Sequence, residues 1–454
     1  MSNVIDLVDQ TAFVGERATG TSNMMQSVWV YNRAIDMDGL RRFHQNLQRG
    51  RLSRRIERSR VPFGRHRWVS PNGQSDLEIA TRRPHAEFDA WLDEQGNTPL
   101  DAEHGPGWHL AVLPFTDGGA GVSLVISHTL ADGIGLADAL VAAAAGRDDP
   151  ISWPAAGSRR RWKALRQDAR QTARDVPAMG RAVAAAARFA RRNPGAAGSG
   201  AQLPDAVRSK FVGPDEPITL AKATIFVDAD EWDARARSLG GTSNALFAGL
   251  AAGLAQRVGR VNADGLATLA IPVNERVDGD TRANAITAVD ITVDPANATR
   301  DLREIRAAIK QALIRHQEVS DERMAMLALA PLLPRWLVRR MVPLALGGPT
   351  TSGASNAAAL DPAVNRPDGT DADYIAMRNF VTGLTKATVH HTGGLLGVSS
   401  ARVHNQVFIT VQAYQPDRAN SNDELQQHIS SVLGDFSLTA MIGWPCPESV
   451  SGAR

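Results

Sequence analysis

The sequence contains a single cysteine, Cys446, among its 454 residues. One thiol cannot form a disulfide within the chain, and it excludes a zinc site built from several cysteines. Proteins without disulfides are compatible with a reducing compartment. We therefore expect a cytoplasmic protein.

The sequence also lacks long apolar runs. Its first residues, MSNVIDLVDQ, have neither the basic region nor the apolar region of a signal peptide. No stretch of about 18 uncharged apolar residues occurs. The nearest candidate, residues 324–346, is interrupted by prolines and arginines: Pro331, Pro334, Arg335, Arg339 and Arg340. We expect no membrane span. If helical, this segment has an apolar face bordered by cations, which suits either the rim of an acyl tunnel, a membrane surface or a core helix.

Positive charge is concentrated in one place, although the net charge is only +2. Residues 159–192 hold eleven Arg or Lys and two acids, Asp168 and Asp175. This pattern fits a peripheral contact with an anionic membrane or lipid droplet, attraction of the phosphates of coenzyme A, or a solvated connecting helix. Trp162 and Phe189 are its only aromatic residues and no nucleic-acid-binding motif accompanies it, so we expect no nucleic-acid partner.

The length predicts more than one domain, and composition places the divisions. Residues 1–150 form an N-terminal half with alternating helical and strand patterns. Residues 151–215 are a basic helical connector, with a break near Pro177, followed by a Gly, Ala and Pro linker. Residues 216–454 form a C-terminal half.

Hydrophobic periodicity gives both halves a mixed fold, α/β or α+β. In the N-terminal half we predict a helix at 38–50, a hairpin of strands at 109–115 and 121–127, and a helix at 135–146. In the C-terminal half we predict strands at 218–228, 266–276 and 288–294, and a hairpin of strands at 395–403 and 406–414. We predict helices at 240–254, 301–317 and 422–436, the last with Asn422 near its cap.

The turn HTLADG, from His128 to Gly133, places polar residues between a predicted strand and a helix. A neutral imidazole can accept a proton near physiological pH, so His128 is a candidate general base. Asp132 is suited either to cap the helix near Gly135 or to pair with an arginine. We expect Gly133 to permit a tight turn with positive φ. The alternative is an ordinary histidine at a strand end.

HTLADG resembles the HHxxxDG signature of the coenzyme A-dependent acyltransferase superfamily. This superfamily includes chloramphenicol acetyltransferase, the condensation domains of peptide synthetases, and bacterial wax ester synthase/diacylglycerol acyltransferases. The last group is the most similar, because further motifs follow in its order. These are GGTSNALF, AIPVNERVDGDTRANAIT with its P-V-x-x-R pattern and following Asn, GASNAAAL, and YQPD.

The resemblance implies two chloramphenicol-acetyltransferase-like halves with the active site at their interface. His128 would deprotonate a hydroxyl of a long-chain alcohol or diacylglycerol, which attacks the thioester of a fatty acyl-CoA. Asp132 would be structural, with Arg276 as the candidate partner. Acyl-CoA would be a co-substrate, and no other cofactor is implied. The resemblance also implies substrate contacts at these positions: Gly133, Asn244, Arg276, Ser355 and Asn356.

Several positions differ from the family pattern. Ser127 stands where the first histidine is expected, Ala245 follows Asn244 in place of aspartate, and residues 357–359 are alanines. Two further functions therefore stay open: a condensation-type enzyme that takes its acyl group from a carrier protein, and a non-catalytic acyl- or lipid-binding homologue. His128 argues against the non-catalytic reading.

Two other polar pairs have simpler interpretations. Ser355 and Asn356 lie in a Gly- and Ala-rich stretch that favours a turn, although they could donate hydrogen bonds to an oxyanion. His390 and His391 have no third ligand at a suitable spacing. We expect a surface strand end there and no metal site.

Overall fold

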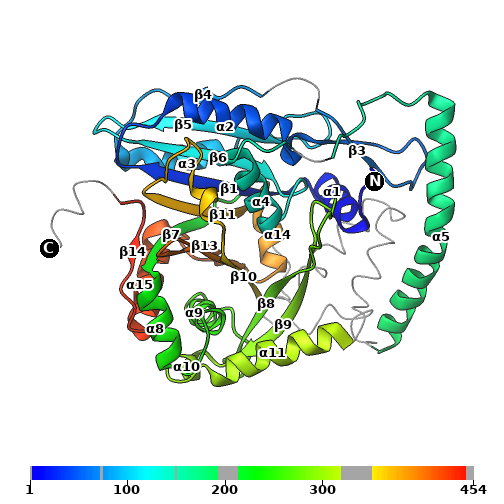
Figure 1. The fold of residues 1–454 in the computed structure, drawn as a ribbon. Helices are drawn as coiled ribbons and strands as arrows, with labels where there is room; N and C mark the ends of the chain where they lie inside the picture. Colours follow the sequence, from blue (N-terminus) through cyan, green and yellow to red (C-terminus); the bar gives the residue numbers. More distant parts are fainter. Residues whose placement is uncertain (1–2, 72–74, 149–150, 193–212, 319–349, 446–454) are drawn as a thin grey trace.

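A computed structural model describes residues 3–71, 75–148, 151–192, 213–318 and 350–445. It contains two main β-sheets, each with its own covering helices (Figure 1). A separate two-stranded ribbon is formed by β2 (Arg55–Glu57) and β3 (Arg67–Val69). The predicted division into two mixed α/β halves matches this arrangement.

The N-terminal sheet has the strand order β11-β1-β6-β5-β4. Its strands are β1 (Ser22–Tyr31), β4 (Glu78–Ile79), β5 (Trp108–Pro114), β6 (Ala120–Ser127) and β11 (Tyr374–Thr382). The helices α2 (Met37–Arg49) and α4 (Gly133–Ala144) pack on the face that carries Trp29, and α3 (Phe88–Gly96) packs on the face that carries Val28 and Val30. Because both faces are covered, β6 is buried along its whole length.

The C-terminal sheet has the order β14-β7-β13-β12-β10-β8-β9. Its strands are β7 (Ala221–Asp228), β8 (Ala267–Asn274), β9 (Ile286–Val293), β10 (Thr351–Ala359), β12 (Leu395–Val403), β13 (Gln406–Tyr414) and β14 (Met441–Ile442). Among the described residues, this half contains the α-helices α8 (Ala229–Ser238), α9 (Ser243–Arg257), α10 (Pro295–Ala298), α11 (Arg303–Glu318), α14 (Lys386–His391) and α15 (Asn422–Asp435). The Ala-rich helix α9 is buried around most of its circumference, at the centre of the largest apolar cluster.

Strand β11 links the two halves. It follows β10 in the chain but pairs antiparallel with β1, so the C-terminal part of the sequence supplies an edge strand to the N-terminal sheet. Side-chain hydrogen bonds also connect β11 to the C-terminal sheet. Asn379 Nδ2 donates to Ser399 Oγ of β12, and Thr410 Oγ1 of β13 donates to the carbonyl oxygen of Met377. The predicted boundaries stay a prediction, but residues 374–382 belong structurally to the first sheet.

Most predicted elements are present. The hairpin of β5 and β6, the helices α2, α4, α9, α11 and α15, and the hairpin of β12 and β13 occupy the predicted ranges within a few residues. Ser421 caps α15, and Asn422 is its first residue. The reason is local: in each case apolar side chains recur with the period of the element they form.

Three local predictions are wrong. Pro177 does not break the connector, because α5 (Arg161–Arg192) continues through it. Ser355 and Asn356 lie in β10 and not in a turn, since pairing with β12 outweighs the turn preference of these residues. His390 and His391 lie at the end of the short helix α14 and not at a strand end, because Thr385 caps the start of a helix there.

The helix α5 lies along one side of the molecule, extending from the level of β3 toward the level of α11 (Figure 1). Within the described ranges, no helix is long and apolar enough to span a membrane. The segment 324–346, for which the sequence leaves several interpretations open, lies outside the described residues.

Candidate active site

His128 leaves the sheet at the end of β6. Its backbone is held on two sides, because its N–H donates to the carbonyl oxygen of Asn23 at 2.9 Å and its own carbonyl accepts from Asn284 Nδ2 at 3.1 Å. Asn23 belongs to β1, and Asn284 lies directly before β9 in the C-terminal half. Residues from both halves therefore fix the position of His128.

The imidazole of His128 is partly buried. Burial lowers its pKa below the ordinary value, while the Asp132 carboxylate and the Asn284 side chain act in the opposite direction. The net lowering favours the neutral ring near pH 7, which is the form that can accept a proton.

Asp132 performs both structural roles that the sequence left open. Its Oδ1 accepts from the backbone N–H of Gly135 at 2.7 Å and so caps α4. Its Oδ2 accepts from Arg276 Nη2 at 2.8 Å and from the backbone N–H of Ala285 at 2.7 Å. Both side chains of the ion pair are buried, and the predicted pairing of Asp132 with Arg276 is confirmed.

Gly135, and not Gly133, is the glycine that this arrangement requires. A Cβ at Gly135 would lie 2.9 Å from Arg276 Nη2, so a side chain there would displace the guanidinium. Gly133 begins α4, has no positive φ and has open space around its Cα. The predicted positive φ at Gly133 is therefore wrong, because the turn enters the helix directly.

Two more buried side chains, Asp9 and Arg54, which sequence reasoning missed, bind the same segment. Both carboxylate oxygens of Asp9 in α1 (Leu7–Thr19) accept from backbone N–H groups, at 2.9 Å from Ala283 and 2.7 Å from Asn284. Arg54 donates to the carbonyl oxygens of Thr281 at 2.8 Å and Leu130 at 3.1 Å. Burial raises the pKa of Asp9 to about 6.

We call the four side chains Asp9, Arg54, Asp132 and Arg276 the clamp. Together they hold the loop between β8 and β9, which belongs to the C-terminal half, against the HTLADG turn of the N-terminal half. Arg276 also donates to the carbonyl oxygen of Ala283 at 3.0 Å within this loop. The clamp thus joins the loop of the C-terminal half to the turn that carries His128.

Ser127 occupies the place where the resemblance expects a histidine, and it begins a hydrogen-bonded chain. Its hydroxyl donates to Thr129 Oγ1 at 3.0 Å, and Thr129 Oγ1 donates to Glu16 Oε2 at 2.9 Å. Glu16 Oε1 accepts from the backbone N–H of Asn23 at 3.0 Å. Burial raises the pKa of Glu16 to about 7, so this carboxyl gains or loses a proton near neutral pH. Sequence reasoning missed Glu16, because α1 contributes to the site only through tertiary packing.

The other predicted substrate contacts form a separate group. Asn356 Nδ2 donates to Asn244 Oδ1 at 3.1 Å, which joins β10 to the N-terminal turn of α9. A bulge follows Asn356 in β10, and Ala358 there has φ of 56°. Ser355 lies opposite Ser399 of β12. In the described chain, no hydrogen bond joins these residues to His128 or Asp132.

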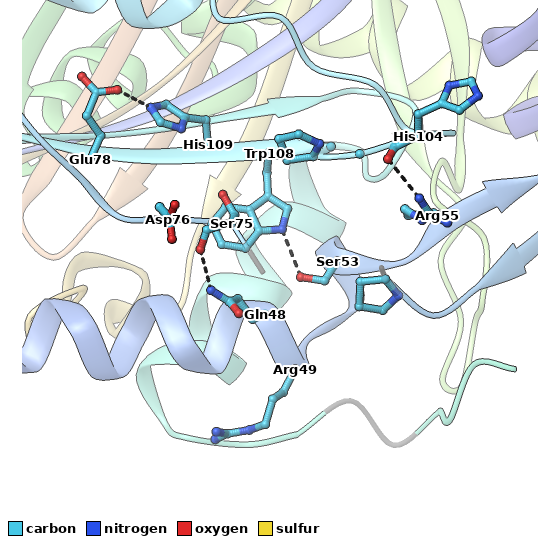
Figure 2. A pocket seen from close by; sticks show the side chains of 14 residues that line it. Gln48, Arg49, Ser53, Arg55, Ser75, Asp76, Glu78, His104, Trp108 and His109 are labelled. Carbon is cyan, nitrogen blue, oxygen red and sulfur yellow. Dashed lines mark hydrogen bonds and ion pairs between the residues drawn. The ribbon is translucent and has the colours of Figure 1, made fainter. Parts of the chain in front are cut away.

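A sizeable cavity lies elsewhere in the described structure. It has a volume of about 720 Å³ and is lined by α2, β4, β5 and residues 104–107 (Figure 2). Several of its polar side chains already have partners. His109 Nε2 lies 2.9 Å from Glu78 Oε2, and Gln48 donates to the carbonyl oxygen of Ser75. None of the predicted site residues lines it. The candidate site is therefore the hydrogen-bonded surroundings of His128 and not this cavity.

One cluster near this cavity has the residue types of a metal site. Among the described residues, Asp101, Glu103 and His104 bring ligand atoms within 4.8 Å of one another. Arg17 pairs with both carboxylates, and Arg58 pairs with Glu103 at 2.6 Å. The charges are thus balanced by arginines, which makes the cluster an ion-pair network.

Removing one member of the Asp132–Arg276 pair should destabilise the fold. We expect Asp132→Ala to lower the free energy of unfolding by about 3–5 kcal/mol, because it leaves a buried guanidinium unpaired. Urea denaturation followed by circular dichroism measures this. As a matched control, Asp435→Ala breaks an exposed pair with Arg257 and should cost about 1 kcal/mol or less. An Asp132→Ala protein as stable as the control yet inactive would instead make Asp132 a direct participant in the reaction.

Glu16 should make stability depend on pH. Its pKa is about 7 in the folded protein and 4.5 as a model value, so between these values the folded state binds more protons than the unfolded state. Stability should therefore fall as pH rises from about 5 to 8, by at most about 3 kcal/mol from this group.

The Glu16→Gln variant should flatten this decline when urea denaturation is compared at the two pH values. Asp9 contributes in the same direction and retains part of the slope. The exposed Glu318→Gln serves as the control and should leave the slope unchanged. An equal slope in Glu16→Gln and in the unmodified protein would contradict the assignment.

No protein-family model and no curated protein matches the chain. Solved structures do match. The first condensation domain of the calcium-dependent antibiotic synthetase, in complex with a substrate analogue, aligns with a TM-score of 0.56 and 14% identity over 96% of each chain. A second complex of that domain gives 0.55 and 15%, over 97% of this chain and 99% of the other. The nonribosomal peptide synthetase FmoA3, with α-methyl-L-serine-AMP bound, gives 0.54 and 15%, over 96% of this chain and 44% of the larger one.

These identities establish the fold and no more. The predicted fold class is confirmed, because condensation domains consist of two chloramphenicol-acetyltransferase-like lobes. They are one of the groups that share the HHxxxDG signature, whereas the expected similarity to wax ester synthases stays an expectation. The chain has the two-lobed fold of peptide-synthetase condensation domains.

Proposed function

We propose that this chain is a condensation-type acyltransferase, in which His128 acts as general base. The observation that carries the proposal is the position of His128. It follows the last residue of β6, in a fold shared with condensation domains. Asn284 of the opposite half donates to its carbonyl oxygen, and the clamp joins the two halves beside it. A partly buried histidine with a lowered pKa at such a junction has the properties of a base rather than those of a charged surface group.

The proposed reaction transfers an acyl group from a thioester to a nucleophilic hydroxyl or amine. The neutral His128 ring accepts the proton of the nucleophile as its oxygen or nitrogen attacks the thioester carbonyl carbon. The tetrahedral intermediate then expels the thiolate, and the imidazolium returns the proton to the sulfur. The products are an ester or amide and a free thiol, and the histidine ends in its initial state.

We propose that the thioester is carried by a carrier protein. The support is the likeness to condensation domains of peptide synthetases over nearly the whole chain. The second candidate is the acyl-CoA-dependent O-acyltransferase, acting on a long-chain alcohol or diacylglycerol. The ordered motifs around Asn244, Arg276 and Asn356 favour it, since these resemble wax ester synthases. A non-catalytic acyl-binding role is the remaining alternative.

A donor comparison tests the choice. The purified chain is given the same acyl group on coenzyme A and on a phosphopantetheinylated carrier protein, with panels of hydroxyl and amine acceptors. Free thiol and product mass are measured. We expect transfer from the carrier protein to be faster at equal donor concentration. Faster transfer from acyl-CoA would establish the second candidate, and no transfer from either donor, with tight acyl binding, would support the non-catalytic role.

His128→Ala should lower turnover by about a hundredfold or more, the usual contribution of a positioned general base. The exposed His104→Ala is the matched control and should retain full activity. In the unmodified protein, the acidic limb of kcat/KM should have an apparent pKa below about 6.5, the ordinary histidine value. The sign follows from burial, which keeps the ring neutral to lower pH, so activity is lost only as pH falls through the lowered pKa. Unchanged turnover in His128→Ala would refute the assignment.

A further inference from the structure

The helix α5 is attached to the body through its two acidic residues. Asp168 is buried and accepts from Arg159 Nη1 at 2.7 Å, from Arg67 Nε at 3.1 Å and from the backbone N–H of Arg60 at 3.0 Å. Asp175 lies two helical turns further along the same face, 3.6 Å from Arg65 Nη1. The acids thus point inward, and this leaves the outward face of the helix positively charged.

The outward face carries a continuous row of cations. Lys163, Arg166, Arg170, Arg174 and Arg181 recur at intervals of three, four and seven residues, which places them on one side of a helix. All five are exposed. In the part of the chain that the structure describes, none of them forms a hydrogen bond or an ion pair. Their charge is therefore free to act on a partner.

An apolar row runs beside the cations. Trp162 is 82% exposed, Leu165 38%, and Val176 and Val183 57% each. The spacing from 162 to 165, 169, 176 and 183 is again helical, with Ala169 filling the position between Leu165 and Val176. A solvated connecting helix has no reason to present a tryptophan and two valines in line to water, because exposing apolar surface is unfavourable.

We propose that α5 is a membrane-surface helix that binds an anionic lipid bilayer. The apolar row enters the boundary between headgroups and acyl chains, and the neighbouring cations contact lipid phosphates. This contact is independent of the reaction that His128 performs. It also differs from membrane spanning, since the row of cations excludes α5 from the hydrocarbon core.

The extent of the surface favours a bilayer over an acidic protein. Residues 162–183 cover roughly 32 Å of helix, at about 1.5 Å per residue. Over this length the small residues Ala169, Ala173 and Gly180 separate the larger apolar ones, so the face is shallow and offers no pocket or ridge for a shaped partner. A planar, fluid, negatively charged surface requires no such shape. Trp162 at the start of the row is the residue type that anchors proteins at membrane interfaces.

Vesicle binding by the full chain tests the proposal. Sedimentation is measured with vesicles of phosphatidylcholine alone and with vesicles of phosphatidylcholine mixed with phosphatidylglycerol, at low and high salt. The unmodified protein should bind the mixed vesicles, less so at high salt. The charge variant replaces four cations with glutamine: Lys163, Arg166, Arg170 and Arg174. It should bind roughly six-hundredfold more weakly, at about fivefold per charge.

Two further variants complete the design. Trp162→Ser should weaken binding to the mixed vesicles at both salt concentrations, because it removes apolar contact and not charge. A control variant replaces four exposed arginines on other faces with glutamine: Arg82, Arg237, Arg300 and Arg315. It should bind like the unmodified protein. The proposal is overturned if the unmodified protein binds neither vesicle, if the control loses as much binding as the charge variant, or if α5 proves to bind an acidic protein in the absence of lipid affinity.

Discussion

The arrangement around His128 depends on one buried ion pair, Asp132 with Arg276. Moving two charges out of water is costly, and an isolated pair seldom recovers that cost. Here the carboxylate also accepts from the N–H groups of Gly135 and Ala285, and the guanidinium also donates to the carbonyl of Ala283. The charges are therefore surrounded by hydrogen bonds. The pair connects the start of α4 to the loop after β8, which lie in different halves of the molecule.

The rest of the site follows from this connection. Once the loop is fixed, Asn284 reaches the carbonyl of His128, and Asp9 in α1 receives the backbone N–H groups of Ala283 and Asn284. Arg54 lies over the Trp68 ring at 4.0 Å and donates to both the loop and the HTLADG turn. The clamp therefore gives the HTLADG turn a fixed environment without contributing a group that must itself react. Strand β11, which the C-terminal part of the sequence supplies to the N-terminal sheet, also joins the two halves.

The residues that differ from the HHxxxDG family pattern have hydrogen-bond partners in the structure. Ser127 is buried and belongs to the hydroxyl chain that ends at Glu16, so the missing first histidine is replaced by a smaller hydrogen-bonded group. Asn244 keeps a partner in Asn356 although alanine follows it. The positions that differ from the signature are thus held by hydrogen bonds in this structure. In the described structure, the exposed cations of helix α5 make no hydrogen bond with His128 or the clamp.

Features of short range were readable from the sequence. The hairpin of β5 and β6, the helix α4, the amphipathic helix α11 and the turn that presents His128 all depend on residues close in the chain, where periodicity and capping act. The pairing of Asp132 with Arg276 was predictable because a family pattern supplied the partner. Asp9, Glu16, Arg54 and the strand role of Ser355 and Asn356 were decided only by tertiary structure. Asp9 and Asn284 are 275 positions apart, and β10 owes its strand to neighbours from distant segments. No local signal encodes such contacts, because burial and partner choice arise only when remote segments pack together.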